Sequence, residues 1–291
     1  MKVSGFTFVR NAVKFDYPVV EAIRSVLPLC DEFIVAVGKS EDSTRELIAS
    51  VPSAKIKIVD TVWDESRREG GNVLALETDK ALDAVSPDSD WAFYIQADEV
   101  IHEKYYPAIR EGMEKWKDKA EVEGLLFNYL HFFGSYGFVA SSRDWYRREV
   151  RIIRKDQGIR SYKDAQGFRK SGKKLNVKLL DAWVYHYGWV KAPSFQQAKL
   201  ESFHKHWHDD NWMKKNIFTA AGFDYNTQGE LKKFGGSHPE VMKDRIALKN
   251  WDFSPDPLKV NIPLAQRMLN GIENLFGWRI GEYKNYRLKR S

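Results

Sequence analysis

Strand-like and helix-like patterns alternate along the first third of this 291-residue chain, and the alternation limits the folds open to it. Four apolar runs rich in β-branched and aromatic residues are predicted to be strands: residues 3–9, 33–37, 55–60 and 91–95. Three stretches with helical spacing of apolar residues lie between them: residues 18–27, 43–51 and 71–85. This order predicts an α/β fold in which a mostly parallel sheet has helices on both faces.

The pattern changes after residue 103. A helix is predicted over residues 106–116, and strands are predicted at 124–131, 149–153 and 183–187. From about residue 193 the chain becomes helical and aromatic, with helices expected at 195–207, 239–248 and 263–275. We therefore expect a first domain of residues 1–192 and a helical C-terminal region of residues 193–291.

The charge and the cysteine content of the chain indicate its cellular location and the classes of ligand that it suits. The net charge is +6, and residues 143–178 alone hold 13 Lys and Arg against 4 Asp and Glu. Such a segment is most often a solvated face, but it also suits a phosphate-bearing ligand, an anionic membrane or nucleic acid. The single cysteine, Cys30, has no internal disulfide partner, and no apolar run reaches the roughly 18 residues of a membrane span. We expect a cytoplasmic protein.

Carboxylates follow directly on the predicted strand at residues 91–95. Gln96, Asp98 and Glu99 come first, and His102 and Glu103 follow. In a parallel sheet this point lies at the ligand-binding edge. A lone Asp there more often caps a helix or a turn, whereas a cluster of hard oxygen ligands suits Mg²⁺ or Mn²⁺ on a diphosphate.

The order of the segments FTFVRNA, SVLPLCDEFIVAVGKSEDST, GGNVLALETDKAL and WAFYIQADEV resembles the bacterial family 2 glycosyltransferases with the GT-A fold. The resemblance covers residues 3–103 and continues more loosely to about residue 190. It implies a transferase, inverting and metal-dependent, that moves a sugar from a UDP-, GDP- or dTDP-sugar to a hydroxyl of a glycan or lipid-linked acceptor. The family also suggests a role in polysaccharide or lipopolysaccharide synthesis.

The resemblance assigns roles to particular residues. Matching family positions imply that Asp98, Glu99 and His186 hold Mn²⁺ or Mg²⁺ on the diphosphate. The first strand and the loop after the second strand imply a nucleotide pocket lined by Arg10, Asn11 and Asp42. The sequence departs from the family at Gln96, which replaces the first Asp of D-x-D, and at residues 36–37, where acidic residues are usual. Gln96 retains the capacity to accept hydrogen bonds from a ribose or water.

An inverting transferase also needs a base for the acceptor hydroxyl. The candidates are Asp164 and Asp144, and we choose Asp164 because neighbouring cations, Lys163 among them, are expected to keep its carboxylate ionised. Arg147 and Arg151 share one face of a predicted strand and are expected to approach the diphosphate. Residues 169–174 look like a basic loop.

Several alternatives stay open. A chain with Gln96 in place of an acidic residue also suits a GT-A module that binds a sugar nucleotide or glycan without turnover. We expect no nucleic acid, because the carboxylates would have no role in binding it. The C-terminal region is expected to cap the acceptor cleft, rest on a membrane or form a homodimer, and the sequence does not choose among these. His204 and His208 form a further, weaker candidate metal pair.

Overall fold

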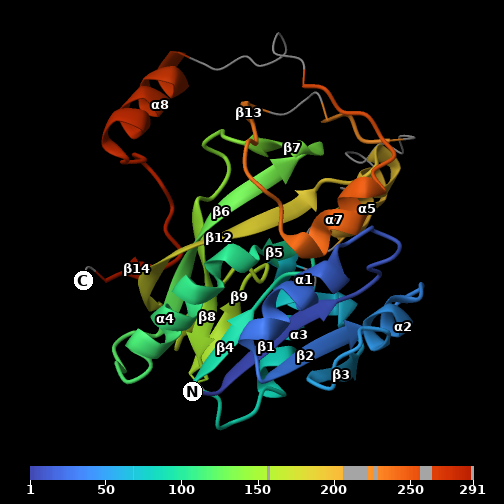
Figure 1. Cartoon of the computed structure of the whole chain (residues 1–291), viewed down its shortest axis with the longest axis vertical. Coiled ribbons are helices and arrows are strands. Elements are labelled where there is room, and N and C mark those ends of the chain that lie inside the picture. Colours follow the sequence, from blue (N-terminus) through green and yellow to red (C-terminus); the bar gives the residue numbers. More distant parts are fainter. Residues whose placement is uncertain (68, 156–157, 206–221, 226–228, 256–263, 290–291) are drawn as a thin grey trace.

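The computed structural model describes residues 1–291 except 68, 156–157, 206–221, 226–228, 256–263 and 290–291. Its framework is a large sheet whose first half is parallel (Figure 1). The strand order in this half is β3 (Ile56–Thr61), β2 (Glu32–Gly38), β1 (Val3–Val9) and β4 (Trp91–Tyr94). All seven residues of β2 are buried, as expected for a central strand with both faces covered.

The second half of the sheet is mixed. Antiparallel pairings extend it from β4 through β8 (Arg148–Arg154), β6 (Gly124–Phe133), β7 (Ser135–Ala140) and β13 (Leu231–Lys233). The long strand β12 (Asn176–Trp189) runs parallel to β6 and also pairs with β5 (Glu99–Ile101) and β14 (Arg287–Leu288). The chain thereby carries the residues around His186 next to those that follow β4.

Helices cover both faces of the parallel half, which confirms the expected α/β fold. On one face, α1 (Val19–Val26) buries Val19, Ala22, Ile23 and Val26, the spacing of a single helical stripe. The same core receives α2 (Thr44–Ala49) and α4 (Tyr106–Trp116). On the other face, α3 (Asn72–Asp83) packs Ala81 and Leu82 against residues of β1, β2 and β4.

Among the described residues, the α-helices that follow β12 are α5 (Pro193–Lys205), α7 (Lys243–Ala247) and α8 (Leu264–Phe276). Arg245 of α7 donates to Asp16 and Glu21, which ties this part of the chain to α1. The helix α8 stands apart from the sheet at the upper left of Figure 1, and Leu275 and Phe276 on it are largely exposed. No helix in the described ranges is both long and apolar enough to cross a membrane.

Residues 169–174, expected to form a loop, instead belong to a small antiparallel sheet. Its strands are β9 (Ile159–Tyr162), β10 (Gly167–Lys170) and β11 (Lys173–Lys174). Arg169 is buried because its guanidinium stacks 4.3 Å from the Tyr162 ring and donates to the carbonyl of Asn285. The turn between β9 and β10 contains Asp164, and it is this turn that reaches the candidate site.

Candidate active site

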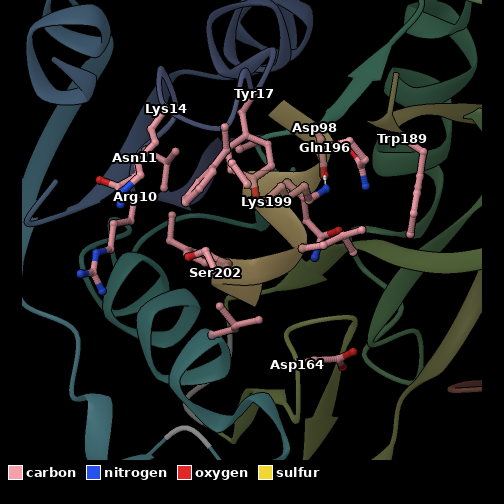
Figure 2. Close-up of a pocket in the computed structure, with 18 of the residues that line it drawn as sticks. Arg10, Asn11, Lys14, Tyr17, Asp98, Asp164, Trp189, Gln196, Lys199 and Ser202 are labelled. Atoms are coloured by element: carbon pink, nitrogen blue, oxygen red, sulfur yellow. Dashed lines mark hydrogen bonds and ion pairs between the residues drawn. The ribbon is translucent and has the colours of Figure 1, made fainter. Parts of the chain in front are cut away.

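A cavity of about 810 Å³ opens at the carboxyl ends of β1 and β4. This is the edge at which ligands bind in open α/β sheets. Figure 2 shows Arg10, Asn11 and Lys14 on one side, Asp98 and Gln196 on another, and Lys199 and Ser202 between them. The segments that line it include the end of β1 with the loop after it, the turn after β4, the β9–β10 turn, the end of β12, and α5.

Asp98 is the central carboxylate of this cavity. It lies in the short turn between β4 and β5, and its side chain is only 13% exposed. Lys199 Nζ lies 3.2 Å from Asp98 Oδ2, and His186 Nε2 lies 3.7 Å from the same oxygen. Burial alone would raise the pKa of Asp98, but the Lys199 ammonium and His186 hold it well below its usual range. Asp98 is therefore ionised at any physiological pH.

The hydrogen bonds of His131 orient the His186 ring, which faces Asp98. Burial lowers the pKa of His131 well below its usual value, so that ring is neutral. His131 Nε2 donates to the carbonyl of Tyr146 (2.8 Å), and His131 Nδ1 therefore accepts from His186 Nδ1 (3.0 Å). This bond leaves His186 Nε2 facing Asp98 and the cavity.

Gly188 keeps the space beside these two groups open. A Cβ atom at this position would lie 2.6 Å from both Asp98 Oδ2 and His186 Nε2. Such a distance is far below van der Waals contact, so any larger residue would push the two side chains away. The absence of a side chain at position 188 thus permits the close approach of Asp98 and His186.

Glu99 and Arg151 do not line the cavity, contrary to the roles expected for them. Both are completely buried, and Arg151 Nε and Nη2 bind the two Glu99 oxygens at 2.8 and 2.7 Å. Tyr129 donates a further bond to Glu99, and Arg151 Nη1 donates to the carbonyl of Gln166. Glu99 therefore binds Arg151 and not a metal, and Arg151 binds Glu99 and not a diphosphate.

This buried pair joins the two turns that supply the site. Glu99 also accepts from the backbone N–H of Gln96, while Arg151 binds the β9–β10 turn at Gln166. Gln96 itself lines the cavity, and its side-chain amide donates to the carbonyl of Ala165 (3.3 Å). An ion pair that does not line the cavity thus connects the Asp98 turn with the Asp164 turn.

Asp164 lines the cavity from a strained turn. Lys163 and Ala165 on either side of it have φ of 54° and 61°, in the left-handed region that side chains other than Gly disfavour. Burial raises the pKa of Asp164, and this outweighs Lys163 and Arg151, which lower it. The cations expected to keep it ionised are therefore the weaker influence, and desolvation makes Asp164 a better proton acceptor than an ordinary Asp.

The other candidate residues differ in whether they line this first cavity. Asp144 lines a second cavity, not the first, and accepts from Ser142. Arg10 and Asn11 line the first cavity as predicted, and the Arg10 guanidinium lies 5.3 Å from the Trp63 ring. Asp42 is not a lining residue, because its carboxylate is used by the Lys14 backbone N–H and by Thr44.

The structure also differs from what we expected for the loop that contains Asp42 and for the strand that contains Arg151. Glu41, the neighbour of Asp42, is the acidic residue of that loop that lines the cavity. Arg147, expected to approach a diphosphate with Arg151, pairs instead with Glu282 and Glu273. Arg147 and Arg151 are therefore both held by ion pairs within the chain.

The helix α5 supplies two residues that were not predicted, Gln196 and Lys199. Gln196 is fully buried and lines the cavity, and neither atom of its amide has a hydrogen-bond partner in the described part of the chain. A buried amide without partners costs roughly 1–3 kcal/mol, so a ligand that pairs with it would gain affinity. The only sequence signal was that positions 196 and 199 share one helix face.

The cavity does not fit a divalent cation bound by a carboxylate cluster. Within the described ranges no three His, Cys, Asp or Glu residues are grouped as metal ligands. Asp98 faces His186, but Lys199 already binds it. Glu99, the next residue, is paired with Arg151. The predicted pair of His204 and His208 falls outside the side chains that the structure describes.

Glu149, a buried carboxyl in the second cavity, gives a test of the electrostatics of this region. Burial raises its pKa from 4.5 to about 7, so between these pH values the native state holds a proton that the unfolded state has released. Stability therefore falls as pH rises through this window, by on the order of 3 kcal/mol for this group. We expect Glu149→Gln to remove that loss and to be more stable than the wild type at pH 8.

Urea unfolding at pH 5 and pH 8 checks this expectation. The exposed Glu46→Gln is the matched control, since it changes the charge equally without burial. If Glu149→Gln and the wild type lose the same stability between the two pH values, Glu149 is not protonated in the native state.

Comparisons with known proteins come from structure alone. No protein-family model matches the sequence, and no curated protein matches it. The chain is similar to S. aureus TarS 1–349 in complex with UDP, at 12% identity and a TM-score of 0.39, over 71% of this chain and 65% of that one. For the longer S. aureus TarS structure the share of that chain is 39%.

A second similar structure is glucosyl-3-phosphoglycerate synthase from Mycobacterium tuberculosis in complex with Mn²⁺, UDP and phosphoglyceric acid. It shares 16% identity at a TM-score of 0.30, over 45% of this chain and 43% of that one. The present chain thus spans less than half of the synthase and of the longer TarS structure. Similarities of this size assign neither a family nor an activity to the chain.

Proposed function

We propose that the chain is a glycosyltransferase that moves a sugar from a nucleotide-diphosphate sugar to a hydroxyl of an acceptor. The observation that carries the proposal is the cavity at the carboxyl ends of β1 and β4. It combines cations, the buried amide of Gln196, which has no hydrogen-bond partner among the described residues, and the carboxylates of Asp98 and Asp164, which lie in different environments. Its volume of about 810 Å³ suits one ligand of nucleotide-sugar size.

The two ends of the cavity would bind different parts of the donor. Arg10, Asn11 and Glu41, with the Trp63 ring behind Arg10, would bind the nucleoside. Lys199 would bind the diphosphate as a charge-assisted donor. The amide of Gln196 would bind sugar hydroxyls, which need both a donor and an acceptor.

Asp164 would act as the base of an inverting displacement. The acceptor oxygen attacks the anomeric carbon as the bond from that carbon to the diphosphate oxygen breaks. The hydroxyl proton passes to the Asp164 carboxylate, and the bonding electron pair leaves with the nucleoside diphosphate. A positioned base of this kind contributes roughly 10²- to 10⁴-fold to the rate, and the raised pKa of Asp164 increases its affinity for the proton.

The Mn²⁺ or Mg²⁺ expected from the family resemblance competes, in this proposal, with a cation that the chain itself supplies. Asp98 and His186 face the same point in the cavity, but Lys199 already binds Asp98. Metal dependence, the division near residue 192, the acceptor class, the cytoplasmic location and the role in polysaccharide synthesis remain predictions from the sequence.

A binding module without turnover is the second candidate. It is favoured by one observation, namely that Gln96 replaces an acidic residue and spends its amide on the carbonyl of Ala165. Such a module would bind the nucleotide and leave the sugar in place.

Thermal unfolding with UDP, GDP and dTDP, each with and without Mn²⁺, tests nucleotide binding. A nucleotide present at about 100 times its dissociation constant adds roughly 2.7 kcal/mol to the stability of the native state. We expect one of the three to raise the melting temperature while the matching nucleoside, which lacks phosphates, does so much less. If no nucleoside diphosphate raises it, the cavity is not a nucleotide site.

A further inference from the structure

Lys199 is held at the centre of the cavity by several fixed contacts. Its ammonium binds Asp98 Oδ2 at 3.2 Å and the carbonyl of Gly188 at 3.0 Å, and it lies 5.1 Å from the Tyr17 ring. Its side chain is only 15% exposed. This is not the geometry of a mobile surface lysine, which would be mostly solvated. Figure 2 shows the contact to Asp98 as a dashed line.

The oxygen atoms that would otherwise hold a divalent cation have partners within the chain. Both oxygens of Glu99 bind Arg151, and position 96 carries a neutral amide. Asp98 and Lys199 neutralise each other, so a divalent cation placed between them would bring two positive charges that no described carboxylate at this point balances. An uncompensated charge in a mostly buried place is costly.

We propose that the Lys199 ammonium takes the place of a divalent cation, so that the donor is bound and cleaved without a metal. The inference rests on the proposed function and adds the nature of the group that holds the diphosphate. Asp98 is then a positioning residue, because it fixes the ammonium and does not bind a metal.

An ammonium group can bind a diphosphate and stabilise its negative charge in place of a divalent cation. It has three N–H donors, of which Asp98 and Gly188 take two, and the third is left for a diphosphate oxygen. As the bond between the anomeric carbon and the diphosphate breaks, negative charge grows on that oxygen. Lys199 stabilises the charge by a stronger hydrogen bond and keeps its proton, so the step releases nucleoside diphosphate without a metal or an added acid.

Titration calorimetry with UDP, GDP and dTDP, in EDTA and in Mn²⁺, distinguishes binding of the diphosphate by Lys199 from binding by a divalent cation. We expect the wild type to bind one of them equally well in both. Lys199→Ala should bind it roughly 10- to 100-fold more weakly in EDTA, the loss expected for one charge-assisted bond, and Mn²⁺ should restore part of the affinity. Lys199→Arg, which keeps the charge, should retain more affinity than Lys199→Ala. The exposed Lys243→Ala is the control for loss of a lysine.

Electron paramagnetic resonance of Mn²⁺ with the protein alone gives a readout that does not need a nucleotide. The wild type should leave Mn²⁺ free, and Lys199→Ala should immobilise it at Asp98 and His186. Wild-type binding of nucleotide that is lost in EDTA and regained with Mn²⁺ would overturn the inference and leave the proposed function intact. A failure of all three nucleotides in both conditions would overturn the proposed function, and this inference with it.

Discussion

Asp164→Asn should slow sugar transfer by roughly 10²- to 10⁴-fold while leaving nucleotide binding close to that of the wild type. The reason is that the carboxylate acts only when the acceptor hydroxyl gives up its proton, whereas the nucleotide is bound by Arg10, Asn11 and Lys199 elsewhere in the cavity. Rates are measured as release of nucleoside diphosphate, and binding is measured by calorimetry on the same preparations.

Asp144→Asn is the matched control, because Asp144 was the rival base in the sequence and lines the second cavity. It should transfer at nearly the wild-type rate. The pH profile adds a second check: activity of the wild type should fall on the acid side at a higher pH than an ordinary Asp would give, since burial raises the pKa of Asp164. If Asp144→Asn is slowed and Asp164→Asn is not, the two roles are reversed.

Breaking the buried pair of Glu99 and Arg151 should cost about 3–5 kcal/mol of unfolding free energy. Both side chains have no exposed surface, so Glu99→Gln leaves the guanidinium buried without a counter-charge. Arg151→Met likewise leaves the Glu99 carboxylate buried without a counter-charge. Replacing both, as Glu99→Leu with Arg151→Met, should recover part of the loss, because two apolar side chains carry no charge to desolvate. Urea unfolding of the three variants measures these differences.

Arg45 and Asp60 provide the control pair. They form an ion pair at 2.8 Å, but both are more than half exposed, so Asp60→Asn should change stability very little. If Glu99→Gln is as mild as Asp60→Asn, the Glu99–Arg151 pair is not fully desolvated in solution. A mild effect would also remove the argument that this pair connects the Asp98 turn with the Asp164 turn.

The parallel half of the fold could be predicted because its signals are local. Apolar runs and helical spacing indicated β1, β2, β3 and β4 and the helices between them, and the structure confirms their order. The position of Asp98 at the end of β4 followed from the general placement of ligands in parallel sheets. Its proximity to His186 was predicted from the family resemblance, and the two lie 3.7 Å apart.

The partners of the charged residues could not be predicted, because they depend on contacts far apart in the sequence. Nothing local shows that Arg151 points inward to Glu99, 52 positions away, and not outward to a ligand. Lys199 reaches Asp98 from a helix 101 residues later, and such a contact leaves no periodic signal. Desolvation, which raises the pKa of Asp164, likewise depends on burial that charge counting cannot reveal.

Release of nucleoside diphosphate from UDP-glucose, GDP-mannose and dTDP-rhamnose, with water as the acceptor, measures whether the chain turns over a sugar nucleotide. We expect the wild type to release the nucleoside diphosphate from at least one donor above the uncatalysed rate, without added metal, and Asp164→Asn to do so at least 100-fold more slowly. A donor that binds in the cavity and stays intact would contradict turnover and favour a binding module. Equal release by the wild type and Asp164→Asn would contradict the assignment of the base.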